Sequence, residues 1–259
     1  MSIRRKLSSV LAGGALAATL VVASAATVGA ASNETCAGGT IASGTYRNLT
    51  VTGFCMLDGG NVTVQRNVKV TSTGALDAMF AESTLTISGN LIVDTGALLA
   101  LGCDPEESAC MDNPDGTSNH SIGRNLIADG AVLMIVHDNR IGGNVEQVGG
   151  GGGFSCNELF PHGPPAFTDY ANNTIGGSAT VTGLRTCWDG FSHNVVGGSV
   201  RLIDNQTAIP DGNLADGNHI SGNFTCLADS PAPHLSDGPV QILNVVGGSA
   251  RGQCAAIST

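Results

Sequence analysis

Basic side chains, aromatic rings and long apolar runs are all scarce in this chain. Lysine occurs only as Lys6 and Lys69, and the formal net charge is −10. Nucleic acid and anionic lipid are bound by clustered Lys and Arg, so we expect neither as a partner. No segment after residue 31 has the eighteen or so consecutive apolar residues of a transmembrane helix, so we expect no membrane insertion.

Common catalytic and metal-binding motifs are also missing. The sequence has no C-x-x-C, and it has no G-x-S-x-G, H-E-x-x-H or P-loop. These absences disfavour a zinc site and the hydrolase and nucleotide-binding classes that such motifs mark. The sequence therefore offers none of these short motifs from which a function could be assigned.

The first 31 residues have the three parts of a secretory signal peptide. Arg4, Arg5 and Lys6 are followed by an apolar run from about Val10 to Val22 and then by small residues through Ala31. We predict a signal peptide over 1–31 and a secreted mature domain over 32–259. The general export route is favoured over the twin-arginine route, because two arginines in a basic leader are common. Without the three basic leader residues the formal charge becomes −13.

All eight cysteines lie after this leader. An even number of cysteines in an exported chain predicts disulfides rather than metal ligands. Spacing alone does not fix the connectivity. Pairing in chain order would close single loops or join neighbouring repeats, as Cys36–Cys55, Cys103–Cys110, Cys156–Cys187 and Cys226–Cys254.

A degenerate repeat runs through the mature domain. The pattern is N-x-Φ-G-G-[NS], where Φ is β-branched and apolar, and Asn173-Thr-Ile-Gly-Gly-Ser178 is a clear copy. Exact copies also begin at Asn139, Asn194 and Asn244, a looser copy begins at Asn218, and earlier, weaker copies precede them. The Φ markers are Val64, Ile87, Ile122, Ile141, Ile175, Val196, Ile220 and Val246. Their spacings cluster near twenty residues, except for two longer ones that contain insertions.

This period predicts a stack of β-strand coils. Alternating apolar and polar residues follow the markers, as in Val68-Lys69-Val70, which indicates strands with one face in a core. We expect the motif glycines to supply the positive φ of a sharp turn. A second corner recurs as Thr95-Gly96-Ala97 and Asp129-Gly130-Ala131. The prediction is an all-β, single-stranded parallel β-helix of about eight to nine coils, with loop insertions and disulfides.

The first motif position is Asn in five late coils: Asn139, Asn173, Asn194, Asn218 and Asn244. Stacked coils would bring these side chains about 4.8 Å apart, which favours an amide ladder. Amides that bind sugar hydroxyls are the alternative. We favour the structural role.

In repeat style the chain resembles the right-handed parallel β-helices of pectate-lyase-like and adhesin-like proteins. The segment Val62–Leu101 also resembles the short coils of bactofilin-type proteins. These resemblances imply the fold. They bring no catalytic motif that matches here, so no active-site residue is carried over from them.

Two insertions are expected to carry any function, because solenoids usually bind ligands through loops. The insertion 103–119 is acidic, and its carboxylates are candidate ligands of Ca²⁺, the one cofactor considered. They are Asp104, Glu106, Glu107, Asp112 and Asp115. Acidic surface loops are common without metal, so we expect no metal there.

The insertion 149–171 and the following coil are rich in aromatic residues. Exposed rings stack on sugars, although rings can equally bury a loop against the solenoid. The candidate ligand-binding residues are Phe154, Phe160, Phe167, Tyr170, Trp188 and Phe191.

Candidates for catalysis are few. Asp94 and Asp129 fall near equivalent corners of consecutive coils, and a carboxylate pair can serve glycoside hydrolysis. Neighbouring acid–base pairs are His137 with Asp138, and Asp189 with His193.

Two functions remain open. The first is a secreted, non-enzymatic surface or matrix protein that binds extracellular polysaccharide or cell-envelope glycan. The second is a carbohydrate-active hydrolase or lyase. End-to-end self-assembly is a third possibility, which capped ends would exclude.

Overall fold

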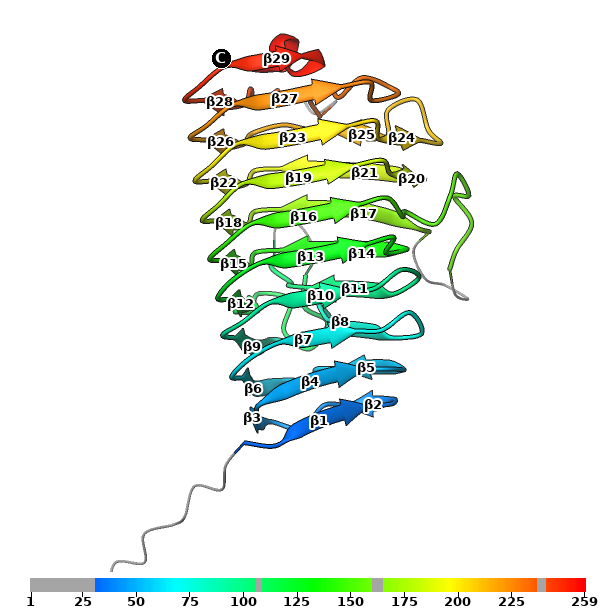
Figure 1. Cartoon of the computed structure of the whole chain (residues 1–259), viewed down its shortest axis with the longest axis vertical. Helices are drawn as coiled ribbons and strands as arrows, with labels where there is room; N and C mark the ends of the chain where they lie inside the picture. Colours follow the sequence, from blue (N-terminus) through cyan, green and yellow to red (C-terminus); the bar gives the residue numbers. More distant parts are fainter. Residues whose placement is uncertain (1–30, 106–108, 160–164, 237–240) are drawn as a thin grey trace, which may run out of the picture. The chain divides into compact units, whose positions relative to one another are not determined.

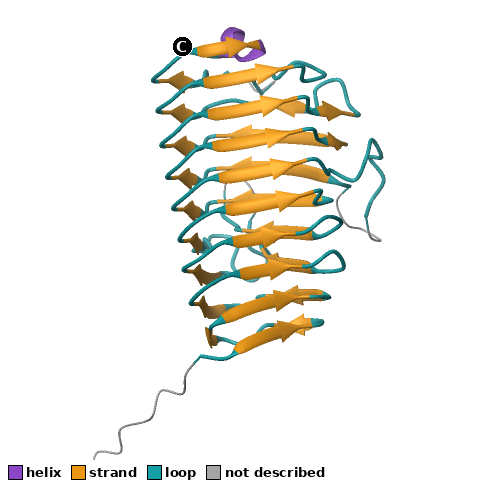
Figure 2. Ribbon diagram, viewed as in Figure 1, coloured by secondary structure: helices purple, strands orange, loops and turns teal. Residues whose placement is uncertain are grey.

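The computed structural model describes residues 31–105, 109–159, 165–236 and 241–259. The predicted leader therefore lies outside the described residues, apart from Ala31. Residues 31–259 form one compact unit of stacked β-coils (Figure 1). Strands make up nearly all of its regular structure, and the described helix is one short 3₁₀ turn, η1 (Gln253–Ile257) (Figure 2). No helix among the described residues is long and apolar enough to cross a membrane.

Three long parallel sheets form the walls of the stack. Sheet A has ten strands among the described residues: β1 (Asn33–Cys36), β4 (Asn48–Val51), β7 (Val68–Val70), β10 (Leu91–Val93), β13 (Leu126–Asp129), β16 (Val145–Val148), β19 (Ala179–Thr182), β23 (Val200–Ile203), β27 (Phe224–Leu227) and β29 (Ala250–Gly252). Each strand pairs with the strand of the coil before and the coil after.

Sheet B has eight described strands: β2 (Gly39–Thr40), β5 (Phe54–Met56), β8 (Ala75–Ala78), β11 (Leu98–Leu101), β14 (Leu133–His137), β17 (Phe167–Ala171), β21 (Trp188–Ser192) and β25 (Asn213–Leu214). Sheet C has nine: β3 (Gly44–Tyr46), β6 (Gly60–Val64), β9 (Ser83–Ile87), β12 (Ser121–Ile122), β15 (Arg140–Ile141), β18 (Thr174–Ile175), β22 (Val195–Val196), β26 (His219–Ile220) and β28 (Val245–Val246). A fourth, two-stranded sheet pairs β20 (Arg185–Thr186) with β24 (Gln206–Thr207).

The fold class predicted from the repeat is confirmed. All eight Φ markers lie in sheet C and face one another in register, from the pair Val64 and Ile87 to the pair Ile220 and Val246. Nine strands in sheet C agree with the expected eight to nine coils, and sheet A adds one more strand. The marker side chains point inward and form one column of the apolar core.

The motif glycines serve a purpose other than the predicted one. None of the glycines in the G-G turns between sheets C and A has a positive φ, whereas the corner glycines Gly96 and Gly130 do. A Cβ on Gly177 would lie 2.8 Å from the carbonyl oxygen of Gly143 in the coil below. Glycine is therefore required because the coils approach closely at this turn, and the expectation of positive φ was wrong there.

The predicted asparagine ladder is present and buried. The backbone N–H of each of the first four asparagines donates to the side-chain oxygen of the next, at 2.9 to 3.1 Å. Their side-chain nitrogens also donate to backbone carbonyls, as Asn194 does to Tyr170 at 2.8 Å. Since these amides bond to one another and to the backbone, the structural interpretation is confirmed.

A second ladder, which the sequence analysis did not assign, follows the last motif position. Asn or Ser there accepts a hydrogen bond from the backbone N–H of the equivalent residue in the next coil, as Asn125 does from Asn144 and Asn144 from Ser178, both at 2.8 Å. This ladder extends to Asn223 and Ser249 at 2.9 Å. Unlike the first ladder, it runs along a largely exposed edge.

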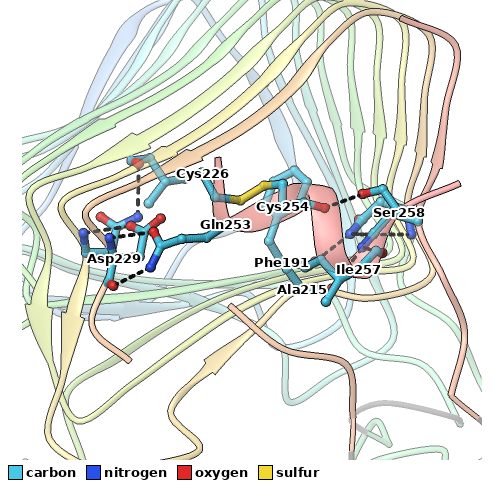
Figure 3. Close-up of a disulfide and its surroundings, with 12 residues drawn as sticks. Phe191, Ala215, Cys226, Asp229, Gln253, Cys254, Ile257 and Ser258 are labelled. Atoms are coloured by element: carbon cyan, nitrogen blue, oxygen red, sulfur yellow. Dashed lines mark hydrogen bonds between the residues drawn. A yellow bond between two sulfur atoms is a disulfide. The ribbon is translucent and has the colours of Figure 1, made fainter. Parts of the chain in front are cut away.

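The four predicted disulfides are all present. Cys36–Cys55 joins the first two coils, and Cys103–Cys110 closes the first insertion. Cys156–Cys187 ties the second insertion to the start of β21, and Cys226–Cys254 ties β27 to η1. Figure 3 shows the last bridge, with Gln253 hydrogen-bonded to Asp229 beside it. Cys254 and Ile257 of η1 are buried, so this turn caps the core at the C-terminal end.

Candidate functional site

The side chains of interest lie on the outward face of sheet B. Residues alternate between core and outside along each strand, so Met134 and Val136 of β14 face the core while Leu133, Ile135 and His137 face outward. We use "Trp188 face" for the outward residues of β14, β17 and β21, which are Leu133, Ile135, His137, Phe167, Asp169, Ala171, Trp188, Gly190 and Ser192.

Two partly exposed rings form the aromatic part of this face. Phe167 and Trp188 are register neighbours in adjacent coils, with ring centroids 6.0 Å apart and planes inclined by 64°. A Cβ on Gly190 would clash with the Trp188 ring and would lie 2.5 Å from a carboxylate oxygen of Asp169. The indole and the carboxylate therefore both lie over Gly190, which leaves room for them.

A hydrogen-bonded pair of a histidine and an aspartate adjoins the rings. His137 Nε2 lies 2.9 Å from Asp169 Oδ2, and the two side chains are only 7% and 14% exposed. Two buried atoms of this face have no hydrogen-bond partner among the described residues, His137 Nδ1 and Ser192 Oγ. Because both atoms are buried, the partly exposed Phe167 and Trp188 rings are the more accessible part of this face, and such rings suit the apolar faces of a sugar.

The second insertion flanks the Trp188 face. Its Leu159 packs with Phe167 against the outward apolar cluster that contains Leu133 and Ile135. Cys187, which immediately precedes Trp188, is bonded to Cys156 of the insertion. The covalent bond holds the insertion next to the strand that carries the indole ring.

Two predicted ligand-binding residues do not belong to any surface. Tyr170 and Phe191 face the core with 0% and 2% exposure, and the Tyr170 hydroxyl donates to Gln147 Oε1 at 2.8 Å. Tyr170 lies three positions after Phe167, and Phe191 lies three positions after Trp188. Because side chains alternate along a strand, each therefore points to the opposite side of its strand. They are removed from the candidate site. Phe154 is 52% exposed on the insertion, and Phe160 lies outside the described residues.

The second insertion is also shorter than predicted. The sequence analysis extended it from 149 to 171, whereas β17 already begins at Phe167. Residues 167–171 are a regular strand of sheet B that pairs with β14 and β21. Their aromatic residues therefore belong to the solenoid wall.

The predicted catalytic candidates do not assemble on this face. Asp94 and Asp129 do follow paired residues of β10 and β13, but on sheet A, and Asp94 is bonded to Lys69 at 3.0 Å. Asp189 faces the core, and burial raises its pKa well above the usual range, with further raising by the charges of Asp229 and Asp169. A buried acid of this kind belongs to the interior and not to the surface of the face.

The face holds an acid–base pair that is not one of the two predicted pairs. His137 bonds Asp169 of the next coil, and its chain neighbour Asp138 is a corner residue with φ 58°. His193 is a corner residue as well, with φ 55°, while Asp189 points inward. Asp169 was missed. Aligning Phe167-x-Asp169 with Trp188-x-Gly190 at equal positions of consecutive coils would have found it.

The acidic insertion shows no metal site within the described part of the chain, where no three His, Cys, Asp or Glu side chains gather. Asp104 is buried, Asp112 Oδ1 accepts the Glu82 backbone N–H at 2.8 Å, and Asp115 is exposed. Glu106 and Glu107 lie outside the described residues. Calcium binding there stays a prediction.

Comparison of the chain with protein-family models, with curated proteins and with solved structures finds no match. Any function is therefore argued from the geometry of the Trp188 face alone.

Proposed function

We propose that this protein is a secreted, non-enzymatic β-helical protein that binds extracellular or cell-envelope glycans on the Trp188 face. One observation carries the proposal: the Phe167–Trp188 ring pair lies directly beside the hydrogen-bonded His137–Asp169 pair. Flat rings stack on the apolar faces of sugars, and adjacent charged groups hydrogen-bond the hydroxyls. The stacked coils act as a rigid scaffold for this face.

The negative charge of the chain favours neutral glycans over anionic ones as ligands. The chain is strongly acidic, and Asp169 lies on the face itself. Because a polyuronate would be repelled by this field, neutral polysaccharides are the proposed ligands. Secretion is supported by the leader pattern and by the four disulfides, which persist in oxidising compartments.

The test is retention of the purified protein on an array of neutral and anionic polysaccharides. Wild-type protein is expected to be retained on at least one neutral polysaccharide and on no polyuronate. Trp188→Ala should reduce retention about tenfold, since stacked aromatic contacts contribute on the order of 1–2 kcal/mol each. The matched control is Phe54→Ala, which removes another exposed ring, 50% exposed, from an earlier coil of sheet B. Equal retention of wild type and Trp188→Ala, with unchanged circular dichroism, would reject the proposal.

A hydrolase is the second candidate, and the His137–Asp169 pair favours it. A carboxyl group held by a histidine can accept or deliver a proton beside a sugar bound on Trp188. The same array distinguishes the two functions if reducing ends are measured after incubation. Release of reducing ends that Asp169→Asn abolishes would establish the enzyme, whereas retention without release favours the binding protein.

A further inference from the structure

A second surface feature lies far from Trp188 in sequence, where the first insertion crosses the early coils. It is a depression of about 270 Å³ with an apolar wall and an acidic rim. The wall consists of Met56, Leu57, Phe80, Ala81 and Met111. The acids are Asp58, Asp77 and Asp112.

Asp77 is the unusual member of this set. It faces Met56 in register on the outward side of sheet B, yet it is only 7% exposed. Its described hydrogen bond is from the Met79 backbone N–H to Oδ1, at 3.2 Å. The basic side chains that form ion pairs among the described residues bond other acids, so none of these bridges neutralises Asp77. Burial of this carboxyl without a cation raises its pKa.

The apolar wall is open to solvent at two residues. Phe80 is 47% exposed and Met111 is 75% exposed, and both line the depression. Large apolar side chains left exposed around a buried charge are unfavourable for the free protein and favourable for a partner that covers both. An aromatic ring and thioethers also attract cations and alkyl groups.

We propose that this depression binds an organic ammonium ion with a short apolar stem. The ammonium group would pair with Asp77, with Asp58 and Asp112 adding to the field, and the stem would lie against Met56, Phe80 and Met111. A neutral apolar ligand would leave the Asp77 charge uncompensated, and an anion would be repelled. No set of three metal-ligating side chains gathers in the described residues, so a bare metal ion is a poorer occupant.

The test uses saturation-transfer NMR on the whole protein with n-butylammonium chloride as the probe and n-butanol as its uncharged counterpart. Butylammonium is expected to receive saturation and to bind with a Kd on the order of 1 mM, in keeping with its few heavy atoms. Butanol should bind at least about tenfold more weakly, because it lacks the charge-assisted bond.

Two variants and one control locate the site. Asp77→Asn should weaken butylammonium binding about tenfold. Phe80→Ala, at an exposed position that leaves the coils intact, should weaken it several-fold. Asp129→Asn removes the same charge from a distant exposed position and should bind like wild type. Absence of saturation transfer to butylammonium, equal binding of butanol, or wild-type binding by both Asp77→Asn and Phe80→Ala would overturn the proposal.

Discussion

At the scale of single residues, the two ladders differ in how much each amide stabilises the protein. Asn194 accepts from the backbone N–H of Asn173 at 3.0 Å inside the core, and water cannot replace it there. Asn144 accepts from the backbone N–H of Ser178 at 2.8 Å on an exposed edge, where water can. The same hydrogen bond therefore contributes more to the free energy of unfolding in the buried asparagine ladder than in the exposed one.

This difference is measurable as a free energy of unfolding. Asn194→Ala should lower it by about 2–4 kcal/mol, because buried donors and a carbonyl lose their partners. Asn144→Ala, the matched control, should lower it by less than about 1 kcal/mol. Guanidinium unfolding monitored by circular dichroism gives both values. Equal losses in the two variants would contradict the ladder account.

Buried carboxyls give a second prediction at this scale. Burial raises the pKa of Asp229 to about 6, and it raises the pKa of Asp189 as well. An aspartate in the unfolded chain has a pKa of about 3.9, so the folded state holds extra protons between these values. The stability that these groups contribute is complete below about pH 4 and is lost as the pH rises through the folded pKa.

The free energy of unfolding contributed by these carboxyls should therefore be larger at about pH 4.5 than at about pH 7.5. Asp189→Asn should flatten this dependence and stabilise the protein at the higher pH, since it removes a buried charge and keeps the side-chain shape. Asp129→Asn, at an exposed position, should leave the pH profile unchanged. A profile of Asp189→Asn that parallels the wild type would show that Asp189 is not the titrating group.

At the scale of elements, regular features were predictable and irregular ones were not. The markers were found because each coil must place a β-branched residue at the same point of sheet C. The sequence could also have predicted which aromatic residues face the core and which face outward. Phe167 and Tyr170 are three positions apart in one strand, so they point to opposite sides of it. The marker position of the first coil was not assigned because Tyr46 stands there in place of a β-branched residue. The long connection between β27 and β28 was missed because its length leaves an ordinary spacing of 26 residues between Ile220 and Val246.

The second insertion gives a prediction at the same scale. Cys156–Cys187 spans 31 residues and fixes the insertion to the wall. Replacing both cysteines by serine should increase hydrogen exchange over 149–159 while strands β14, β17 and β21 stay protected, because the ladders and core hold those strands. Removing Cys103–Cys110 instead should leave 149–159 unchanged. Loss of protection throughout sheet B would show that the disulfide holds the solenoid itself.

At the scale of the whole described solenoid, the two ends are protected in different ways. The C-terminal end is covered by η1, whereas at the other end Glu34 occupies an inward position of β1, in register with the core residue Leu49. An inward charge on an edge strand discourages pairing with a second copy. Glu34→Leu should therefore promote self-association in sedimentation velocity, while Thr35→Leu, on the outward side of the same strand, should not. A monomeric Glu34→Leu protein would argue against this role.

The central claim is that glycan is bound on the Trp188 face, and the chain contains a single tryptophan. Tryptophan fluorescence therefore reports that face alone. Titration with xylo-, cello-, chito- and malto-oligosaccharides is predicted to change the emission of Trp188 saturably for at least one of them, with a weaker response in Asp169→Asn. Binding of an oligosaccharide, detected by calorimetry, with no change in tryptophan emission would contradict the account, as would the absence of binding by all four.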